Sequence, residues 1–412
     1  MDFNYFLTKI RDVKVSDFLA TGKLFAAVLL SPLYKKRFRH TWLVCEERYE
    51  ARDNGYWFFQ YMTQRQPQRK CVYAIGRDSV DYPKVAELGE TVEYGSLRHW
   101  ILYLTCEYNI SSQKGGKPNA ALCAFLELNG LFKPKNVFLQ HGVIINDTKW
   151  LYADCSRFHY FITSAIPETA FIRQRFGYPE SVIACAGLAR FDNLHDFTVK
   201  KNRVLIMPTW RAWFRLKSKQ ASAHDADFET SEYLSAWKAL LNADMMKRLI
   251  QDWKLEVVFY PHRNMQDYLP YFADVDSGVT IASWKDYDVQ DLLRSSAMLI
   301  TDYSSVFFDM IYMKKPIAFY QFDEEKFRAR QYGEGWFDYR RNAFGKAFSS
   351  APDVLRELER CVRNGFAVSS EYLQEHQKIF QYYDACNSER IYRLLKDAET
   401  HGAMERGFEV EQ

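Results

Sequence analysis

Short apolar segments that alternate with helical stretches constrain this chain most, because strands separated by helices form a parallel sheet. A first series of such segments begins at Thr41, a polar stretch at residues 194–202 interrupts it, and a second series begins at Arg203. The chain has 412 residues, which exceeds the size at which one hydrophobic core usually keeps growing. We therefore expect an α/β fold with two domains.

The interruption divides the chain into four predicted parts. These are an N-terminal segment (1–40), a first domain (41–195), a second domain (196–385) and a helical tail (386–412). Within the second domain, residues 217–231 are polar and are expected to form a surface loop near Thr209 and Arg211.

Composition excludes several classes of function. The 55 Lys and Arg residues nearly balance the 52 Asp and Glu residues, and the net charge of +3 gives no reason to expect a nucleic-acid partner. The eight cysteines are scattered without a CxxC pair, so they predict buried free thiols in a reducing compartment and neither a zinc site nor a redox site.

The apolar run Leu24–Leu33 spans about ten residues, whereas a transmembrane helix needs about twenty, so it is not expected to cross a bilayer. A basic cluster follows the run directly and consists of Lys35, Lys36, Arg37, Arg39 and His40. This pattern is typical of a segment that lies on an anionic membrane surface. A core helix followed by a solvated basic turn would give the same pattern, and the sequence does not decide between the two.

Candidate ligand-binding residues follow directly after apolar strands, where parallel α/β sheets bind their ligands. The four predicted strand ends carry His141 and Gly142; Thr209 and Arg211; His262 and Arg263; and Asp302, Tyr303, Ser304 and Ser305. Each residue alone is more often structural, but together they predict an anion site, because guanidinium, imidazole and hydroxyl groups bind phosphate oxygens. Ser304 or Ser305 could instead simply be the N-cap of the helix that follows.

One long segment, DVQDLLRSSAMLITDYSSVFFDMIYMKKPIAFYQFD (Asp288–Asp323), resembles the signature of the CDP-glycerol glycerophosphotransferases, a family of teichoic-acid primases and polymerases. The shorter pieces FLQHG, GLARFD, LIMPTWR and FYPHR match that family in order and approximate spacing. The resemblance covers roughly residues 40–385. It implies a GT-B fold, in which two Rossmann-like domains face a cleft and the second domain holds most of the nucleotide.

The resemblance also implies roles for individual residues. His141 is similar to the family's catalytic histidine on the acceptor side, and His262 to its second functional histidine. Tyr303 and the two serines after it fall in the phosphate loop. By analogy with other GT-B enzymes Asp309 would face the ribose hydroxyls, although an ordinary aspartate on the helix surface remains an alternative.

The implied reaction is attack by a hydroxyl of an undecaprenyl-diphosphate-linked acceptor on the β-phosphorus of a CDP-polyol, with release of CMP. A neutral imidazole suits the role of base, so His141 is expected to accept the proton. Neither a cofactor nor a metal ion is implied, and the enzyme is expected to be peripheral on the cytoplasmic face of the bacterial membrane.

Several alternatives stay open. The chain could be a GT-B glycosyltransferase that uses a nucleotide sugar for capsule synthesis, or a non-catalytic nucleotide-binding scaffold of the envelope assembly machinery. The resemblance does not separate glycerol from ribitol as the polyol, or a primase from a polymerase.

Overall fold

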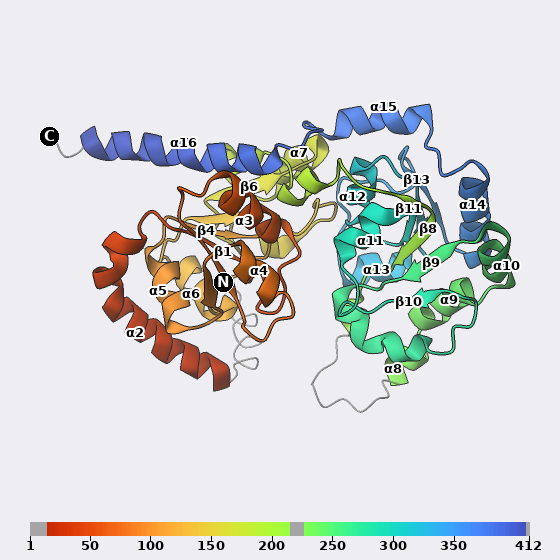
Figure 1. Ribbon diagram of the computed structural model, residues 1–412, viewed down its shortest axis with the longest axis horizontal. Helices are drawn as coiled ribbons and strands as arrows, with labels where there is room; N and C mark the ends of the chain where they lie inside the picture. The colour runs from red at the N-terminus through yellow and green to blue at the C-terminus, as the bar shows by residue number, and fades with distance from the viewer. Residues whose placement is uncertain (1–14, 215–225, 409–412) are drawn as a thin grey trace.

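The computed structural model describes residues 15–214 and 226–408, which form two domains, each around its own parallel sheet (Figure 1). The first domain contains a seven-stranded sheet of order β3-β2-β1-β4-β5-β6-β7. Its strands are β1 (Trp42–Cys45), β2 (Cys71–Ile75), β3 (Thr91–Glu93), β4 (Tyr108–Ser111), β5 (Asn136–Phe138), β6 (Tyr160–Thr163) and β7 (Ile183–Cys185). All neighbouring strands are parallel.

The connections of the first domain are mostly helical. They are α2 (Val15–Phe38), α3 (Asn54–Arg65), α4 (Tyr82–Leu88), α5 (Leu97–Thr105), α6 (Ala120–Leu128), α7 (Ile166–Arg175) and the short 3₁₀ helices Lys149–Leu151, Glu180–Val182 and Ala189–Asn193. Every residue of β1 and β2 is buried. A parallel sheet is covered by helices on both faces, and this explains why its strands are unbroken apolar runs in the sequence.

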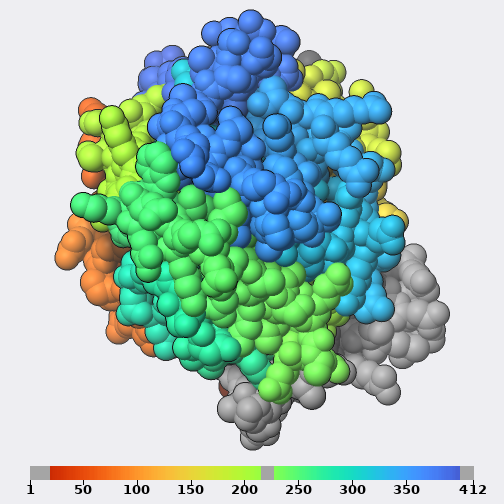
Figure 2. Space-filling model, turned by 90° about the vertical axis from the view of Figure 1, so that its right-hand side faces the viewer, coloured from red at the N-terminus to blue at the C-terminus, as the bar shows by residue number. Residues whose placement is uncertain are grey.

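The second domain contains a six-stranded parallel sheet of order β10-β9-β8-β11-β12-β13. Its strands are β8 (Lys200–Met207), β9 (Glu256–Phe259), β10 (Thr280–Ile281), β11 (Ser296–Thr301), β12 (Ile317–Tyr320) and β13 (Gly345–Phe348). Its helices are α8 (Ala226–Glu229), α9 (Glu232–Leu241), α10 (Asp244–Trp253), the 3₁₀ helix Arg263–Phe272, α11 (Val289–Ser295), α12 (Phe307–Tyr312), α13 (Glu324–Arg330), α14 (Ala351–Arg363) and α15 (Ser370–Ile379). Figure 2 shows the outer side of this domain, where its green and blue segments pack together.

The predicted α/β fold with two Rossmann-like domains is therefore confirmed, and the two sheets are arranged as a GT-B fold requires. The interruption predicted near residue 195 falls between β7 and β8. Of the expected surface loop 217–231, residues 217–225 lie outside the described part of the chain, and the next residues form α8.

The last helix, α16 (Asn387–Phe408), returns from the second domain to the first (Figure 1). Asp192 of the first domain accepts hydrogen bonds from the backbone N–H groups of Asn387 (2.7 Å) and Ser388 (2.9 Å) at the start of α16. Further along, Glu399 accepts from the indole of Trp42 at 2.8 Å and from Arg69 at 2.7 Å. These contacts attach the end of the chain to the first sheet and link the two domains a second time.

The N-terminal segment forms a long helix with one packed side and one exposed side. The apolar run and the first three basic residues form one continuous helix, α2, which includes Pro32, and Lys35 to Arg37 are its last turn. One side of α2 packs against the core around α5 through Ala27 and Phe38. The large apolar side chains that remain exposed are Leu19, Phe25, Val28, Leu29 and Leu33. Within residues 15–214 and 226–408, no helix is both long and apolar enough to cross a bilayer.

Candidate active site

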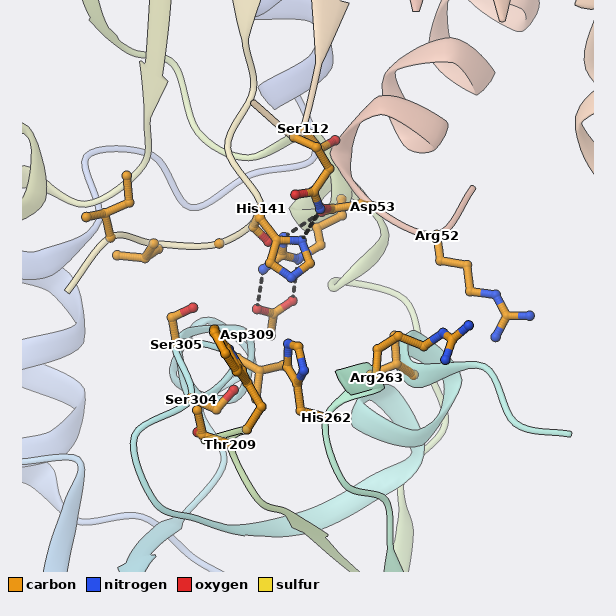
Figure 3. Close-up of a pocket in the computed structure, with 18 of the residues that line it drawn as sticks. Arg52, Asp53, Ser112, His141, Thr209, His262, Arg263, Ser304, Ser305 and Asp309 are labelled. Atoms are coloured by element: carbon orange, nitrogen blue, oxygen red, sulfur yellow. Dashed lines mark hydrogen bonds and ion pairs between the residues drawn. The ribbon is translucent and has the colours of Figure 1, made fainter. Parts of the chain in front are cut away.

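A pocket of about 460 Å³ lies between the two domains and is lined by side chains from both (Figure 3). The wall from the first domain includes His141, which follows β5. The preceding residue, Gln140, has a positive φ of 66°, a backbone conformation that non-glycine residues rarely adopt. Asn54 donates a hydrogen bond to the Gln140 carbonyl at 2.8 Å and holds this turn in place. The imidazole of His141 is 64% exposed, so it is accessible from the pocket.

A carboxylate holds the imidazole of His141. Asp53, the N-cap residue of α3, places Oδ2 2.5 Å from His141 Nδ1. The carboxylate of Asp53 raises the pKa of His141 above its ordinary value, although the positive charge of Arg190 opposes the shift. Behind Asp53, the buried Glu46 accepts hydrogen bonds from the Tyr56 N–H and the Ser112 hydroxyl, both at 3.0 Å. Burial and the neighbouring Asp53 raise the pKa of Glu46 to about 7.

The wall from the second domain consists of the ends of three adjacent strands. Strands β9, β8 and β11 are neighbours in the sheet, so the residues that follow them converge (Figure 3). The sequence-predicted residues that line the pocket here are Thr209, His262, Arg263, Tyr303, Ser304, Ser305 and Asp309. The prediction that separate strand ends would meet at one site is thus matched by their positions in the fold.

His262 is uncharged and its ring has a defined hydrogen-bond polarity. Burial lowers its pKa to about 3, and the charge of His141 adds to the effect. Its Nδ1 accepts a hydrogen bond from the backbone N–H of Asn264 at 3.1 Å. We assign the proton of the neutral ring to Nε2 on this basis, which makes Nε2 a hydrogen-bond donor.

The two serines do not cap the helix as the sequence suggested. Helix α12 begins at Phe307, and in the described structure its flanking residue, Val306, makes no side-chain capping hydrogen bond. Ser304 and Ser305 lie in the preceding turn and line the pocket. The buried hydroxyl groups of Thr209 and Tyr303, which line the same pocket, have no hydrogen-bond partner among the described residues. The second domain therefore presents a group of hydroxyls to the pocket.

Arg211 and Asp302 do not line the pocket, contrary to expectation. The guanidinium of Arg211 is fully buried and forms ion pairs with Asp302 (Nη2–Oδ2, 2.8 Å) and with Asp323 (Nε–Oδ2, 2.8 Å). Asp302 also accepts hydrogen bonds from the backbone N–H groups of Thr209 (2.8 Å) and Tyr303 (2.7 Å). The carboxylate of Asp302 thus binds the loop after β8 and the loop after β11 on the side away from the pocket, and it fixes the distance between them.

Asp309 lines the pocket, but its oxygens are occupied by an arginine. Arg190 donates hydrogen bonds to Asp309 through Nε and Nη2, both at 2.7 Å, so both carboxylate oxygens of Asp309 already have a partner. Arg190 belongs to the first domain, and its Nη1 donates to Asp53 Oδ1 at 3.0 Å. Arg263 likewise pairs across the domains with Glu50 at 2.7 Å.

Gly142 permits the close approach of the two walls. A Cβ at this position would lie 2.9 Å from Ser305 Oγ and 3.5 Å from Arg190 Nη2. A second such position is Gly335, where a Cβ would lie 1.8 Å from the Ile145 carbonyl oxygen. At Gly335 the neighbour is backbone and only glycine leaves enough space, whereas at Gly142 the neighbour is the end of a serine side chain, which a Cβ would displace.

Comparison with known proteins identifies the family. The sequence model for CDP-glycerol:poly(glycerophosphate) glycerophosphotransferases matches residues 25–397. The chain belongs to this family.

Individual members of the family share a quarter to a third of their aligned residues with this chain. The minor teichoic acid biosynthesis protein GgaB of Bacillus subtilis is 28% identical over 368 residues, which cover 87% of this chain and 40% of GgaB. The teichoic acid poly(glycerol phosphate) polymerase of Bacillus spizizenii is 25% identical over 252 residues, which cover 56% of this chain and 55% of that protein. The chain thus spans about half or less of the length of these relatives.

A solved structure of the wall teichoic acid polymerase TagF has the same fold, with a TM-score of 0.63 and 16% sequence identity. The alignment covers 95% of this chain and 100% of that one. The resemblance to the glycerophosphotransferases that the sequence suggested is confirmed, as is the GT-B fold.

Sequence reasoning missed Asp53, Arg190 and Glu46. Arg190 lies in the GLARFD segment, but nothing in that segment indicates which residues it contacts. Asp53 precedes a helical stretch as a typical N-cap residue, a signal that predicts a cap and not a contact with His141. Glu46 directly follows β1 and could have been found by the rule that polar residues at strand ends form sites.

The buried position of Arg211 predicts an effect on stability. Replacing Arg211 with Ala should lower the free energy of unfolding by about 3 to 5 kcal/mol, because two carboxylates would stay buried without their partner. Chemical denaturation monitored by tryptophan fluorescence measures the change. Arg393→Ala, which removes an exposed partner of Glu389, is the control and should cost less than about 1 kcal/mol. Weakened donor binding with unchanged stability would instead place Arg211 at the phosphates.

Proposed function

We propose that this pocket transfers a polyol phosphate, glycerol phosphate in the first instance, from a CDP-activated donor to a hydroxyl of a membrane-linked acceptor. The acceptor oxygen attacks the β-phosphorus, the bond from phosphorus to the CMP oxygen breaks, and CMP leaves. The product is one phosphodiester longer, as in a growing teichoic-acid-like or capsular polymer. One observation carries the proposal: the imidazole of His141 in one domain faces the turn with Ser304 and Ser305 in the other across one pocket.

His141 accepts the proton of the acceptor hydroxyl. Its Nδ1 is occupied by Asp53, which leaves the other ring nitrogen available to a substrate. An imidazole suits this role near neutral pH, because its neutral form is populated and is basic enough to take a proton from an alcohol as the new bond forms.

The second domain binds the diphosphate of the donor. His262 donates from Nε2, and the hydroxyls of Thr209, Ser304 and Ser305 donate beside it. Neutral donors stabilise the negative charge that develops on the departing CMP without the cost of burying a free cation. Membership of the glycerophosphotransferase family supports a CDP-polyol as the donor.

Removing the base should separate catalysis from binding. We expect His141→Ala to lower turnover by about 10² to 10⁴ while donor affinity stays nearly unchanged, because a general base acts on the acceptor hydroxyl and not on the donor. CMP release and isothermal titration with CDP-glycerol measure the two quantities. Turnover within a few-fold of the wild type would exclude His141 from this role.

Removing both serine hydroxyls should affect the donor. Ser304→Ala combined with Ser305→Ala is expected to weaken CDP-glycerol binding and to lower turnover, since groups that face the phosphates act in both the ground state and the transition state. Ser369→Ala, which changes a helix cap in the second domain, is the control. Unchanged calorimetric affinity in the double variant would remove the serines from the donor site.

The donor itself separates this proposal from its main alternative. Purified protein should release CMP from CDP-glycerol or CDP-ribitol when a synthetic undecaprenyl-diphosphate-linked acceptor is present. A GT-B glycosyltransferase would instead consume a UDP-sugar and ignore both CDP-polyols. A scaffold protein would bind a nucleotide without turnover.

Helix α2 provides the membrane contact that a lipid-linked acceptor requires. Its exposed face carries Phe25, Leu29 and Leu33, with 69%, 65% and 77% of each residue accessible to solvent. Basic side chains occupy the last turn of the same helix. An exposed apolar stripe that ends in basic residues fits the surface of an anionic bilayer and supports our proposal that the protein acts at the cytoplasmic face of the bacterial membrane.

Neutralising the basic cluster should release the protein from vesicles. Replacing Lys35, Lys36, Arg37 and Arg39 with Gln should weaken binding to phosphatidylglycerol vesicles by roughly two to three decades at low salt, because each cation contributes about 1 kcal/mol near the surface. Salt should release the wild type progressively. Vesicle sedimentation measures both effects.

A variant with four exposed basic residues of the second domain changed to Gln has the same change of net charge and is the control. The residues are Lys285, Arg341, Lys346 and Lys378. This variant should bind vesicles as the wild type does. Equal binding by the α2 variant and the wild type would place the membrane contact elsewhere.

A further inference from the structure

The carboxylate of Asp53 is shared between the candidate base and a buried arginine. Oδ2 lies 2.5 Å from His141 Nδ1, and Oδ1 accepts a hydrogen bond from Arg190 Nη1 at 3.0 Å. The amide of Gln113 reaches both partners, with Nε2 2.9 Å from His141 Nδ1 and 3.4 Å from Asp53 Oδ2. A carboxylate oxygen can only accept, and Asp53 Oδ2 is nearer to Nδ1 than the Gln113 amide is, so we assign the proton of the neutral ring to Nδ1 and let the amide donate to Asp53.

Arg190 extends this contact to the other domain. Its guanidinium holds Asp309 of α12 through two hydrogen bonds of 2.7 Å each, and Nη1 also donates to the His141 carbonyl at 2.7 Å. The side chain is 9% exposed, and that of Asp309 is 1% exposed. Asp53 and Asp309 together compensate the buried charge of Arg190, so both carboxylates fix the position of the guanidinium. Helix α12 directly follows the turn that carries Ser304 and Ser305.

We propose that Asp53 is the positioning residue for His141, and that Arg190 makes this positioning depend on contact between the acceptor and donor domains. The proposal rests on the role of His141 as the base. Asp53 orients the ring and fixes its tautomer, which leaves Nε2 to accept the proton of the acceptor hydroxyl. Arg190 is held between Asp53 and Asp309, so the base is oriented while the two domains are in contact.

A purely structural role for Asp53 makes a different prediction. Asp53 also caps α3, since its side chain accepts from the Asn54 N–H at 2.8 Å. Asparagine caps a helix about as well as aspartate does, but it carries no charge. Asp53→Asn therefore keeps the cap and removes the negative charge that faces His141 and Arg190.

The charges around His141 decide the sign of the pH effect. Asp53, Glu46 and Glu47 favour the protonated ring, whereas Arg190 disfavours it, and His262 is neutral in the range where His141 titrates. Asp53 makes the largest contribution and raises the pKa of His141. A base must be deprotonated to act, so the wild type loses activity as the pH falls through this raised pKa. Without the charge of Asp53 the pKa falls, and the acid limb of the rate profile moves to lower pH.

The test compares Asp53→Asn with the wild type. We expect the same melting temperature within a few degrees, a donor KM within about threefold, and a kcat lower by about 10² to 10⁴, as when an orienting carboxylate is neutralised in a hydrolytic triad. The acid limb of kcat should shift to lower pH. Asp288→Asn, which neutralises another helix cap that touches neither His141 nor Arg190, should keep the wild-type profile.

The dependence on domain contact has its own test. Asp309→Asn loosens Arg190 without touching His141, so it should also lower kcat and shift the acid limb. Because Asp53 and Asp309 act through one guanidinium, the effects of the two substitutions on kcat should be clearly less than additive. Additive effects would overturn the role of Arg190.

The positioning of His141 by Asp53 can also be tested by an NMR titration, which needs no catalytic turnover and so does not depend on the proposed function. NMR of the protein labelled at histidine Cε1, assigned with His141→Ala, should show His141 titrating above its ordinary pKa of about 6.5 in the wild type and lower in Asp53→Asn. Equal titration in both proteins, or a wild-type kcat and acid limb in Asp53→Asn while His141→Ala is inactive, would overturn the inference and leave the function standing. Failure of the wild type to use any CDP-polyol would count against the function instead.

Discussion

The arrangement of the pocket depends on one buried cation, the guanidinium of Arg190, which lies between Asp53 of the first domain and Asp309 of the second. A buried arginine is stable only when its charge and its hydrogen bonds are satisfied, and here each domain supplies one of the two carboxylates. The positions of the residues on both sides of the pocket follow from these two ion pairs of Arg190. His141 lies against the Asp53 carboxylate, and the turn that carries the serines leads directly into the helix of Asp309.

The second domain contains a similar buried arginine with two carboxylates, behind the loops that line the pocket. Arg211 joins Asp302 and Asp323 behind the loops that present Thr209 and Tyr303. The two arginines thus have different tasks, since one fixes loops within a domain and the other joins the domains. Both are buried and paired with carboxylates, and the second domain adds neutral donors to the pocket in Thr209, His262 and the two serines.

Much of the fold could be predicted, because the period and the length of apolar runs report burial directly. The runs that become β8, β9 and β11 are each followed by polar residues, and neighbouring parallel strands bring those residues together. Exposure could not be predicted in the same way. Arg211 follows its strand as closely as Thr209 does, yet its side chain turns into the core toward Asp323, a partner 112 residues away in the sequence.

The contacts that organise the pocket are equally remote in sequence. Arg190 is separated from Asp53 by 137 positions and from Asp309 by 119, and no local pattern marks such pairs. For the N-terminal helix, by contrast, the local pattern was clear but the packing was not. Its apolar run and basic cluster were visible in the sequence, but the packing of Ala27 and Phe38 on one side, which leaves Leu29 and Leu33 exposed on the other, required the tertiary structure.

The central claim is that a CDP-polyol is bound between these two walls with its β-phosphate near His141. The most direct measurement is a crystal structure of the protein soaked with CDP-glycerol. We predict hydrogen bonds from the diphosphate oxygens to His262 Nε2 and to the hydroxyls of Ser304 and Ser305, with the ion pairs of Arg190 intact and the glycerol end directed toward His141. A nucleotide bound outside this pocket, or a diphosphate that displaces Asp309 to pair with Arg190, would contradict the account.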